Sequence, residues 1–284
     1  MSDIPKFSVL LSNGTSEITI SRNSIYRLIS ADGLESGDYN IFSSVNSQIH
    51  GASVISRHLR PRRIIIEFEA STPERGEMHR SELLSFFNPL RSGTLTVTRG
   101  SNVRSIKYIP EKAEFIQPTL FDALRIKATL FCADPFFTNP QDTAVSSRAS
   151  VPMLSLPFNS LVGVGITAGL SVSTNTFTVN NSGDAEVGLT VSIRASGEVV
   201  NPFVRNEGRE VRILDTMREG DVYEICTIPG AKRLSKNGVN VFNFDRKSEF
   251  FTLATGTTSV VIGADFGSDA ITSSIVYNVK YLGI

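Results

Sequence analysis

The sequence predicts a mostly β protein of two domains, in which one helix interrupts the strands of the first half and a β-sandwich of jelly-roll type forms the second. Three observations predict this class. Apolar and β-branched residues alternate with polar ones over many short segments, turn residues separate these segments, and one stretch alone has helical periodicity. The length of 284 residues also suits two ordinary domains.

Strand signals are strong in the first half of the chain. Over residues 63–70 and 123–132, apolar side chains alternate with polar or charged ones, so each strand would present one face to a core. The pair Asn13-Gly14, which favours the positive φ angles of a tight turn, joins the first two expected strands. Further strands are expected at 6–11, 17–20, 93–98 and 103–110.

One helix is expected, over residues 72–88. Ser71 can cap its first turn, Glu74 completes a capping box, and Pro73 falls where its missing N–H costs nothing. The pair Asn88-Pro89 ends the helix, because a residue before proline avoids the α region. We expect the helix to pack on the open face of a sheet through one apolar stripe. The stripe consists of Met78, Leu83, Leu84 and Phe87.

A change in composition after residue 138 divides the chain. Residues 139–157 are rich in Ser, Ala, Pro, Gln and Thr, which predicts a linker between an N-terminal domain (1–138) and a C-terminal domain (158–284). Short strands separated by Gly- and Asn-containing turns fill the second domain and predict its sandwich. These strands are expected at 173–180, 187–195, 202–206, 210–214, 222–227, 239–244, 250–253, 259–264 and 274–281.

The composition argues against several classes of protein. Lys and Arg together number 28, as do Asp and Glu, so the chain lacks the basic excess of a nucleic-acid binder. No stretch approaches the roughly 20 apolar residues of a membrane span, and no signal peptide is visible. We therefore expect a chain that is made in a cytoplasm and has neither a membrane nor a specific nucleic-acid sequence as its partner.

No residue set predicts catalysis. The sequence has no HExxH, P-loop, CxxC or Gly-x-Ser-x-Gly pattern. His79 shares the expected helix with Glu82 but has no second histidine at metal-binding spacing, so we expect a solvated side chain. Gly163-Val-Gly165 lacks the third glycine and the βαβ context of a phosphate-binding loop.

Two pairs of carboxylates are candidates for a catalytic or a metal-binding site. Glu67 and Glu69 could serve glycoside hydrolysis, but they alternate on a strand as many exposed residues do. Asp265 and Asp269 could hold Ca²⁺, but the dense oxygen-ligand pattern of a calcium loop is missing. We therefore name no catalytic, cofactor-binding or metal-binding residue, and we expect no cofactor.

Three remaining features have ordinary explanations. Cys132 and Cys226 lie inside apolar strands and are expected to be buried free thiols. The basic run 57–63 is expected to be a solvated loop, or a patch that pairs with acidic groups of another subunit, in preference to a nucleic-acid contact. Aromatic residues of the second half are expected in its core, with a sugar-binding platform as the alternative; they are Phe177, Phe203, Tyr223, Phe242, Phe244, Phe250, Phe251, Phe266 and Tyr277.

The order of features in the first half resembles that of the siphophage-type distal tail proteins, the Dit family. The resemblance rests on Ala31-Asp-Gly-Leu34, on the long strand 62–69 before the helix, and on 83–89 followed by Gly93-Thr-Leu-Thr-Val. The segment Phe131-Cys-Ala-Asp-Pro-Phe-Phe is similar to the family's domain ending. The resemblance implies that this half is a β-sandwich ring domain with one helix and a hairpin extension.

The second half resembles the C-terminal domain of the family's members from phages of Gram-positive bacteria. That domain is galectin-like, or similar to a carbohydrate-binding module. The matching segments are turns and strand ends without catalytic residues, namely Val179-Asn-Asn-Ser-Gly-Asp184, Asn201-Pro-Phe203, Gly220-Asp221, Ser248-Glu-Phe-Phe-Thr-Leu253 and Tyr281-Leu-Gly-Ile284.

The resemblance implies a structural protein of the virion tail tip and not an enzyme. Six copies would form a homohexameric ring between the tail tube protein and the tail-tip protein, assembled in the cytoplasm of the bacterial host. The second domains would carry receptor-binding or baseplate proteins. Two alternatives stay open. One is a carbohydrate-binding module that contacts host cell-wall glycans, and the other is a cell-wall hydrolase with a catalytic pair that the sequence does not reveal.

Overall fold

The computed structural model describes residues 7–45, 50–70, 76–119, 122–147 and 175–284. The chain divides into two compact units. Unit 1 consists of the described residues up to Pro140 together with Lys280–Ile284, and unit 2 lies between Gln141 and Val279. The expected linker 139–157 begins with a strand in unit 2, β11 (Thr143–Ser147), and its remainder lies outside the described residues.

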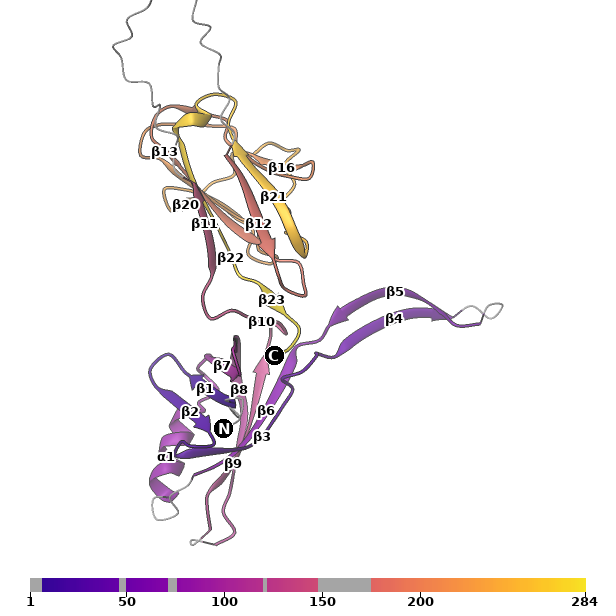
Figure 1. Cartoon of the computed structure of the whole chain (residues 1–284), viewed down its shortest axis with the longest axis vertical. Helices are drawn as coiled ribbons and strands as arrows, with labels where there is room; N and C mark the ends of the chain where they lie inside the picture. Colours follow the sequence, from indigo (N-terminus) through magenta and orange to yellow (C-terminus); the bar gives the residue numbers. More distant parts are fainter. Residues whose placement is uncertain (1–6, 46–49, 71–75, 120–121, 148–174) are drawn as a thin grey trace, which may run out of the picture. The chain divides into compact units, whose positions relative to one another are not determined.

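Unit 1 is built on a sheet that closes on itself (Figure 1). Its strand order is β8-β7-β1-β2-β3-β6-β9, and β8 pairs with β9 as well as with β7, so the β-sandwich that the resemblance implied takes the form of a closed barrel. Neighbouring strands are antiparallel except β2 and β3. The strands are β1 (Phe7–Ser12), β2 (Glu17–Ser21), β3 (Tyr26–Asp32), β6 (Arg62–Ala70), β7 (Gly93–Arg99), β8 (Asn102–Ile116) and β9 (Arg125–Cys132).

Alternation along the strands fills the barrel. In β6, the side chains of Ile64, Ile66 and Phe68 are fully buried, whereas the residues between them reach the surface. The same pattern in β9 buries Ile126, and the Cys132 thiol is free and buried as expected. Closure gives each barrel strand a partner on both sides, although β2 and β3 are paired only at Ile20 and Tyr26.

Helix α1 (Gly76–Phe86) packs on the barrel, through a stripe that differs from the predicted one. Leu83 and Phe87 are buried as expected, but Met78 and Leu84 are exposed. His79 takes the expected place of Met78: it is buried, not solvated, and its ring lies edge-on to the ring of Tyr26. The capping box predicted at the start of the helix lies outside the described residues.

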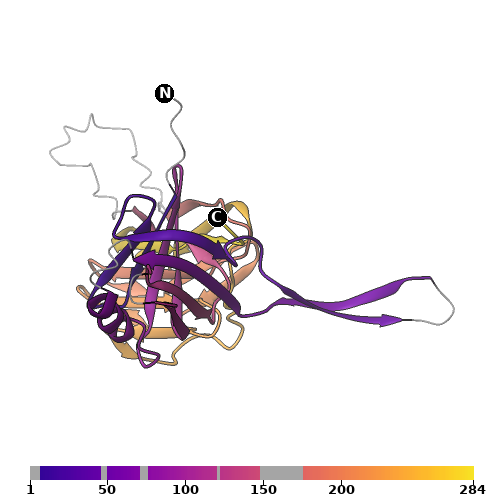
Figure 2. The same ribbon diagram turned by 90° about the horizontal axis from the view of Figure 1, so that it is seen from below.

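Two strands leave the barrel between β3 and β6. They are β4 (Tyr39–Val45) and β5 (Ala52–Leu59), which pair with each other and with no other described strand. Figures 1 and 2 show this hairpin extending far from the barrel strands to which it is connected. A hairpin extension is what the resemblance implied, but the sequence did not indicate its position.

Unit 2 is a sandwich of two main antiparallel sheets. The first has six strands, namely β11, β22 (Ile271–Tyr277), β13 (Leu189–Ala195), β18 (Val222–Cys226), β19 (Arg233–Lys236) and β20 (Val239–Asn240). The second has four strands, namely β12 (Asn175–Asn181), β21 (Gly256–Gly263), β15 (Phe203–Asn206) and β16 (Arg209–Arg212). The short strands β14 (Val199–Val200) and β17 (Thr216–Met217) pair with each other, and η2 (Ser268–Ala270) is a 3₁₀ turn.

Predicted turns of unit 2 have the expected backbone. Glu207-Gly208 and Asn237-Gly238 have positive φ at both residues, as a tight hairpin between twisted strands requires. Two strand predictions were wrong. Residues 250–253 form only a single bridge, between Val187 and Leu253, and 239–244 is paired as a strand only over β20. After β20 the chain leaves the six-stranded sheet, and Leu214 N donates a hydrogen bond to Asn243 O next to β16.

The aromatic residues of unit 2 are only partly in the core. Phe177, Phe203, Phe251, Tyr223 and Tyr277 are buried as expected. The prediction was wrong for Phe242 and Phe266, which are 86% and 62% exposed. Among the residues of this unit that the structure describes, the exposed aromatic rings are therefore phenylalanines. No described helix is long and apolar enough to cross a membrane.

Candidate functional site

The hairpin of β4 and β5 carries the clearest candidate surface. Both strands are rich in large apolar side chains that their own unit does not cover, namely Tyr39, Ile41, Phe42, Val45, Val54 and Ile55. Ile41 and Phe42 are consecutive, so they point to opposite faces of the hairpin, and they are 64% and 54% exposed. Both faces of the hairpin therefore present apolar surface to the solvent.

A hairpin of this kind is poorly stabilised on its own. A two-stranded sheet without a packed face is at best marginally stable in water, and each strand has one edge free to pair. Burying one large apolar side chain contributes roughly 1.5–3 kcal/mol. A partner that covered several of the six side chains would therefore stabilise the hairpin strongly, and its exposed strand edges could add backbone hydrogen bonds.

The root of the hairpin is fixed by Arg62, the first residue of β6. Its Nη1 donates a hydrogen bond to Gly33 O at 2.9 Å and another to Glu35 O, and its Nη2 donates to Leu282 O. The guanidinium carbon lies 5.0 Å from the centre of the Phe137 ring. Burial lowers the pKa of Arg62, but arginine remains charged in proteins. One cation thus joins the segment that enters the hairpin to the last residues of the chain.

These last residues belong to unit 1. Strand β23 (Lys280–Tyr281) pairs with β10 (Phe137–Thr138), which in turn pairs with β8. Ile284 N donates a hydrogen bond to Leu34 O at 3.2 Å, and Arg104 donates to Gly283 O while its guanidinium carbon lies 3.6 Å from the Tyr281 ring centre. The segment therefore contacts the same turn that Arg62 holds.

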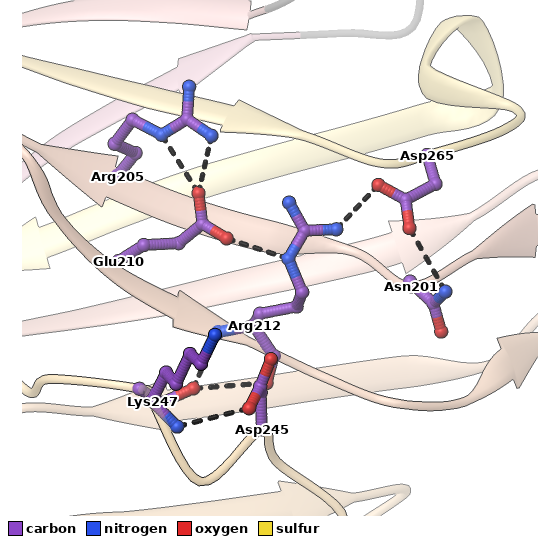
Figure 3. Close-up of polar contacts among 8 residues, drawn as sticks. Asn201, Arg205, Glu210, Arg212, Asp245, Lys247 and Asp265 are labelled. Atoms are coloured by element: carbon purple, nitrogen blue, oxygen red, sulfur yellow. Dashed lines mark hydrogen bonds and ion pairs between the residues drawn. The ribbon is translucent and has the colours of Figure 1, made fainter.

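A second candidate surface, which we call the arginine cluster, lies on the four-stranded sheet of unit 2 (Figure 3). Glu210 lies between two arginines. Its Oε2 accepts a hydrogen bond from Arg205 Nε at 2.8 Å, and its Oε1 accepts one from Arg212 Nε at 2.7 Å. Arg212 also donates to Asp265, whose other oxygen accepts from Asn201 Nδ2 at 3.0 Å. Opposite charges therefore alternate along the cluster and cancel.

The arginine cluster is rigid and accessible to solvent. The guanidinium carbons of Arg205 and Arg212 each lie 4.9 Å from the centre of the Phe203 ring, so both groups make cation–π contacts with this ring. Hydrogen bonds from Arg212, and then from Asn201, lower the pKa of Asp265. Asp265 therefore stays charged near neutral pH, and the cluster suits polar recognition better than proton transfer.

A third cluster has a structural role. Lys236 Nζ lies 2.7 Å from Asp215 Oδ2 and 3.2 Å from Asp221 Oδ2, and the Tyr223 hydroxyl donates to Asp215 at 2.6 Å. Burial, with the hydrogen bond to Asp215, raises the pKa of Tyr223 to about 12. A backbone hydrogen bond from Arg218 N, with others from Asn237 and Lys236, lowers the pKa of Asp221 to about 2. The cluster ties β18 and β19 to the loop before them.

The carboxylates weighed from the sequence are engaged in ordinary pairs. Glu67 lies 3.1 Å from Lys127 Nζ, and Glu69 lies 3.7 Å from Arg27. Asp265, considered above as a calcium ligand with Asp269, belongs to the arginine cluster, where its two oxygens accept hydrogen bonds from Arg212 and Asn201. Over the described residues, no group of three or more His, Cys, Asp or Glu side chains is placed to hold a metal ion.

The basic run 57–63 does not form one patch. Arg57 and His58 lie on β5, and Arg60 donates to Asn40 across the hairpin. Arg62 is buried at the root, and the Nε of Arg63 donates to Glu111 at 2.8 Å on the barrel surface. The expected solvated loop is therefore reduced to the two residues between β5 and β6. Sequence reasoning missed the role of Arg62, because nothing in the run distinguishes it from its neighbours.

No protein-family model matches the sequence, and the curated proteins gave no match. The crystal structure of the SPP1 Dit protein, described as a paradigm of the hub adsorption apparatus in phages that infect Gram-positive bacteria, aligns with a TM-score of 0.70. The alignment covers 96% of this chain and 98% of that one, at 11% identity. The chain has the Dit fold.

Baseplate structures support the same fold. Chains in the structures of the phage P2 baseplate in its activated conformation, with Ca and with Sr, align with TM-scores of 0.53 and 0.54. Each alignment covers 98% of this chain and 99% of the other, at 10% identity. The Dit fold therefore extends over both units, although nine residues in ten differ from those of the solved structures.

Proposed function

We propose that this chain is a structural, non-enzymatic protein of a phage tail tip, in the role of a distal tail protein. The observation that carries the proposal is the hairpin, a pair of strands whose apolar side chains have no cover in their own unit. The Dit fold supports it, because the solved proteins with this fold are a hub protein and components of a baseplate. The expected domain division of a ring domain and an outer domain is part of the proposal.

In this proposal, six copies form a closed ring. Each hairpin reaches the next copy and buries its apolar side chains there, which is a heterologous contact of the kind that generates rings when the rotation closes. The ring joins the tail tube protein to the tail-tip protein, in the virion, after assembly in the host cytoplasm. Unit 2 carries the receptor-binding or baseplate proteins. No step of this role needs a catalytic group.

The test is the mass of the purified chain by light scattering over a range of concentrations, with particle images of the same sample. We expect a six-membered ring with an open centre. The variant I41S/I55S should remain folded and lose the ring, because both side chains are exposed in the isolated chain. Leu90→Ser is the matched control, since Leu90 is 92% exposed on the barrel unit and outside the hairpin. A ring that survives I41S/I55S would contradict the proposal.

A second candidate function is the binding of host cell-wall glycans by unit 2. The arginine cluster favours it, since it holds fixed donors and acceptors on an open sheet face, and hydroxyl-rich ligands need such groups. The test is a glycan array probed with the whole chain and with Arg212→Met, with the exposed Arg194→Met as control. Binding lost in the first variant alone would support this function, whereas no binding to any glycan would exclude it for the set tested.

A further inference from the structure

Unit 2 contains a pocket of about 220 Å³ that none of the candidate surfaces includes. It lies where the chain passes from β20 to the four-stranded sheet, and residues of β19, β20 and the following segment form its walls. The lining is mostly apolar, and its members are Lys232, Arg233, Leu234, Asn240, Val241, Phe242, Phe244 and Phe250.

Three phenylalanines meet at this pocket. The rings of Phe244 and Phe250 pack edge to face, with their centres 6.0 Å apart. Phe242 lies at the rim and is 86% exposed, more than any other phenylalanine among the described residues. The exposed ring of Phe242 and the neighbouring apolar pocket together offer a ligand a continuous apolar surface.

The charged side chains that line the pocket have one sign. Lys232 and Arg233 line it, and none of its lining residues is acidic. Arg233 is already paired with Glu224 at 2.9 Å, whereas Lys232 Nζ lies over the Phe250 ring, 5.9 Å from its centre. The turn between Phe244 and Phe250 adds two exposed basic residues, Arg246 and Lys247, and it also contains Asp245 and the exposed Glu249. A ligand with negative charge beside an apolar group would match this surface.

The volume of the pocket and its position at the edge of a sheet further limit the kind of ligand that can bind. The pocket is smaller than the roughly 300–1,000 Å³ of most small-molecule sites, and suits a single side chain. Its wall includes β20, the last strand of the six-stranded sheet, where an extended segment can be added as a further strand. A sugar would leave most of its hydroxyl groups without partners against three phenylalanine rings.

We propose that this pocket binds an extended, acidic segment of a partner protein, which inserts one large apolar side chain between Phe242 and the Phe244–Phe250 pair. The inference rests on the proposed function, in which unit 2 carries other proteins, and it assigns the place and chemistry of that attachment. Lys232, with Arg246 and Lys247, pairs with the acidic residues on either side of the inserted side chain.

The experiment uses the whole chain and three labelled synthetic peptides, with binding measured by fluorescence anisotropy. The first peptide has a central phenylalanine between Asp and Glu residues. The second has serine at the centre, and the third has lysine in place of every acidic residue. We expect the first to bind more tightly with falling salt, the second to bind at least about tenfold more weakly, and the third not to bind.

Variants then locate the binding. Phe242→Ser should weaken binding of the first peptide by about tenfold or more, and Lys232→Glu should weaken it and reduce its salt dependence. Phe266→Ser is the matched control, because Phe266 is also exposed in unit 2 but does not line the pocket. Its affinity should equal that of the unaltered chain. Both phenylalanines are exposed, so neither variant should impair folding.

Each other outcome overturns the inference. No binding of the first peptide, equal binding of all three, or binding that Phe242→Ser leaves unchanged would each do so. A glycan that binds to the unaltered chain and not to Phe242→Ser would show that the pocket serves sugar. The mass of the unaltered chain separates the two proposals. If that chain forms a ring but does not bind the first peptide, only the pocket inference fails, and if it binds the peptide but forms no ring, only the hub proposal fails.

Discussion

Strands β5 and β6 are separated by two residues, and they differ in what covers their apolar side chains. In β6, Ile64, Ile66 and Phe68 are completely buried in the barrel. In β5, Val54 and Ile55 are 62% and 71% exposed. Both strands contain β-branched residues and are paired on at least one side. A segment of this chain can therefore form a strand without being buried, and of these two strands only β6 has its apolar side chains buried.

The difference separates the part of unit 1 that stabilises a single copy, the barrel, from the part that we expect to contact another copy, the hairpin. Barrel strands gain their stability within one copy, because alternation matches a closed sheet that has an interior. The hairpin has strands with apolar side chains on both faces, which no single copy covers in the described structure. Changes in the barrel should therefore lower the stability of the isolated chain, and changes in the hairpin should leave it nearly unaltered.

The largest effect is expected for Gly33→Ala at the root of the hairpin. Gly33 has a φ of +81°, and an added Cβ would lie 2.3 Å from the carbonyl oxygen of Arg63. The variant should lose about 3 kcal/mol or more of unit 1 stability, measured by differential scanning calorimetry. Gly51→Ala near the hairpin tip is the control, since its φ is +101° but no atom lies within 4 Å. Equal losses in both variants would contradict the assigned clash.

Next in size is the difference between two isoleucines. Ile66→Ala leaves a cavity in the barrel and should cost about 3 kcal/mol in urea unfolding. Ile55→Ala on the hairpin removes the same atoms from an exposed position and should cost less than about 0.5 kcal/mol at concentrations where the chain is monomeric. Similar costs at both sites would mean that the hairpin is covered by its own chain.

A smaller loss of unit 1 stability is expected for Arg62→Met, because this variant removes the cation that binds the segment at the root of the hairpin. Three carbonyl groups, of Gly33, Glu35 and Leu282, would lose their donor, at a cost of about 2 kcal/mol. Hydrogen exchange should increase at residues 33–35 and 282–284 in particular. The neighbouring Arg63→Met breaks an exposed ion pair and should cost less than about 1 kcal/mol. Uniform exchange across unit 1 would argue against the local role of Arg62.

The smallest effect is a loss of unit 2 stability in acid. Asp221 has a folded pKa of about 2, below its ordinary value of 3.8. Its contribution is therefore present above about pH 4 and is lost as the pH falls toward 2. Melting temperatures measured between these values should fall, and Asp221→Asn should reduce the fall. An unaltered pH profile in that variant would show that other groups cause it.

Sequence patterns located the barrel strands better than the hairpin. The alternation over 63–70 has a physical cause, a strand with one face in a core, and β6 occupies nearly the same residues. Strand β4 reads Tyr-Asn-Ile-Phe-Ser-Ser-Val, with apolar side chains for both faces, so its pattern does not alternate. A strand whose apolar side chains would be buried by another protein chain need not alternate apolar and polar residues, and strand prediction depends on that alternation.

Phe242 and His79 show the same limit for single residues. Phe242 stands two positions before Phe244, which predicts a shared buried face, but strand pairing ends at Asn240 and the ring lies outside. His79 was expected in water because it is a lone histidine on the helix, yet Tyr26 and the barrel cover it. In both cases the outcome depends on contacts between segments distant in the sequence, which one chain's residue pattern does not contain.

The pairing of β10 with β23 makes unit 2 an exchangeable insert. The chain leaves unit 1 after β10 and returns at β23, and these are neighbouring strands, about 5 Å apart. Any domain whose own ends lie that close could occupy the same position without altering the barrel, and a short loop could replace it altogether. We expect a protein built this way to change its second domain readily, by recombination or by design, while the barrel and hairpin stay the same.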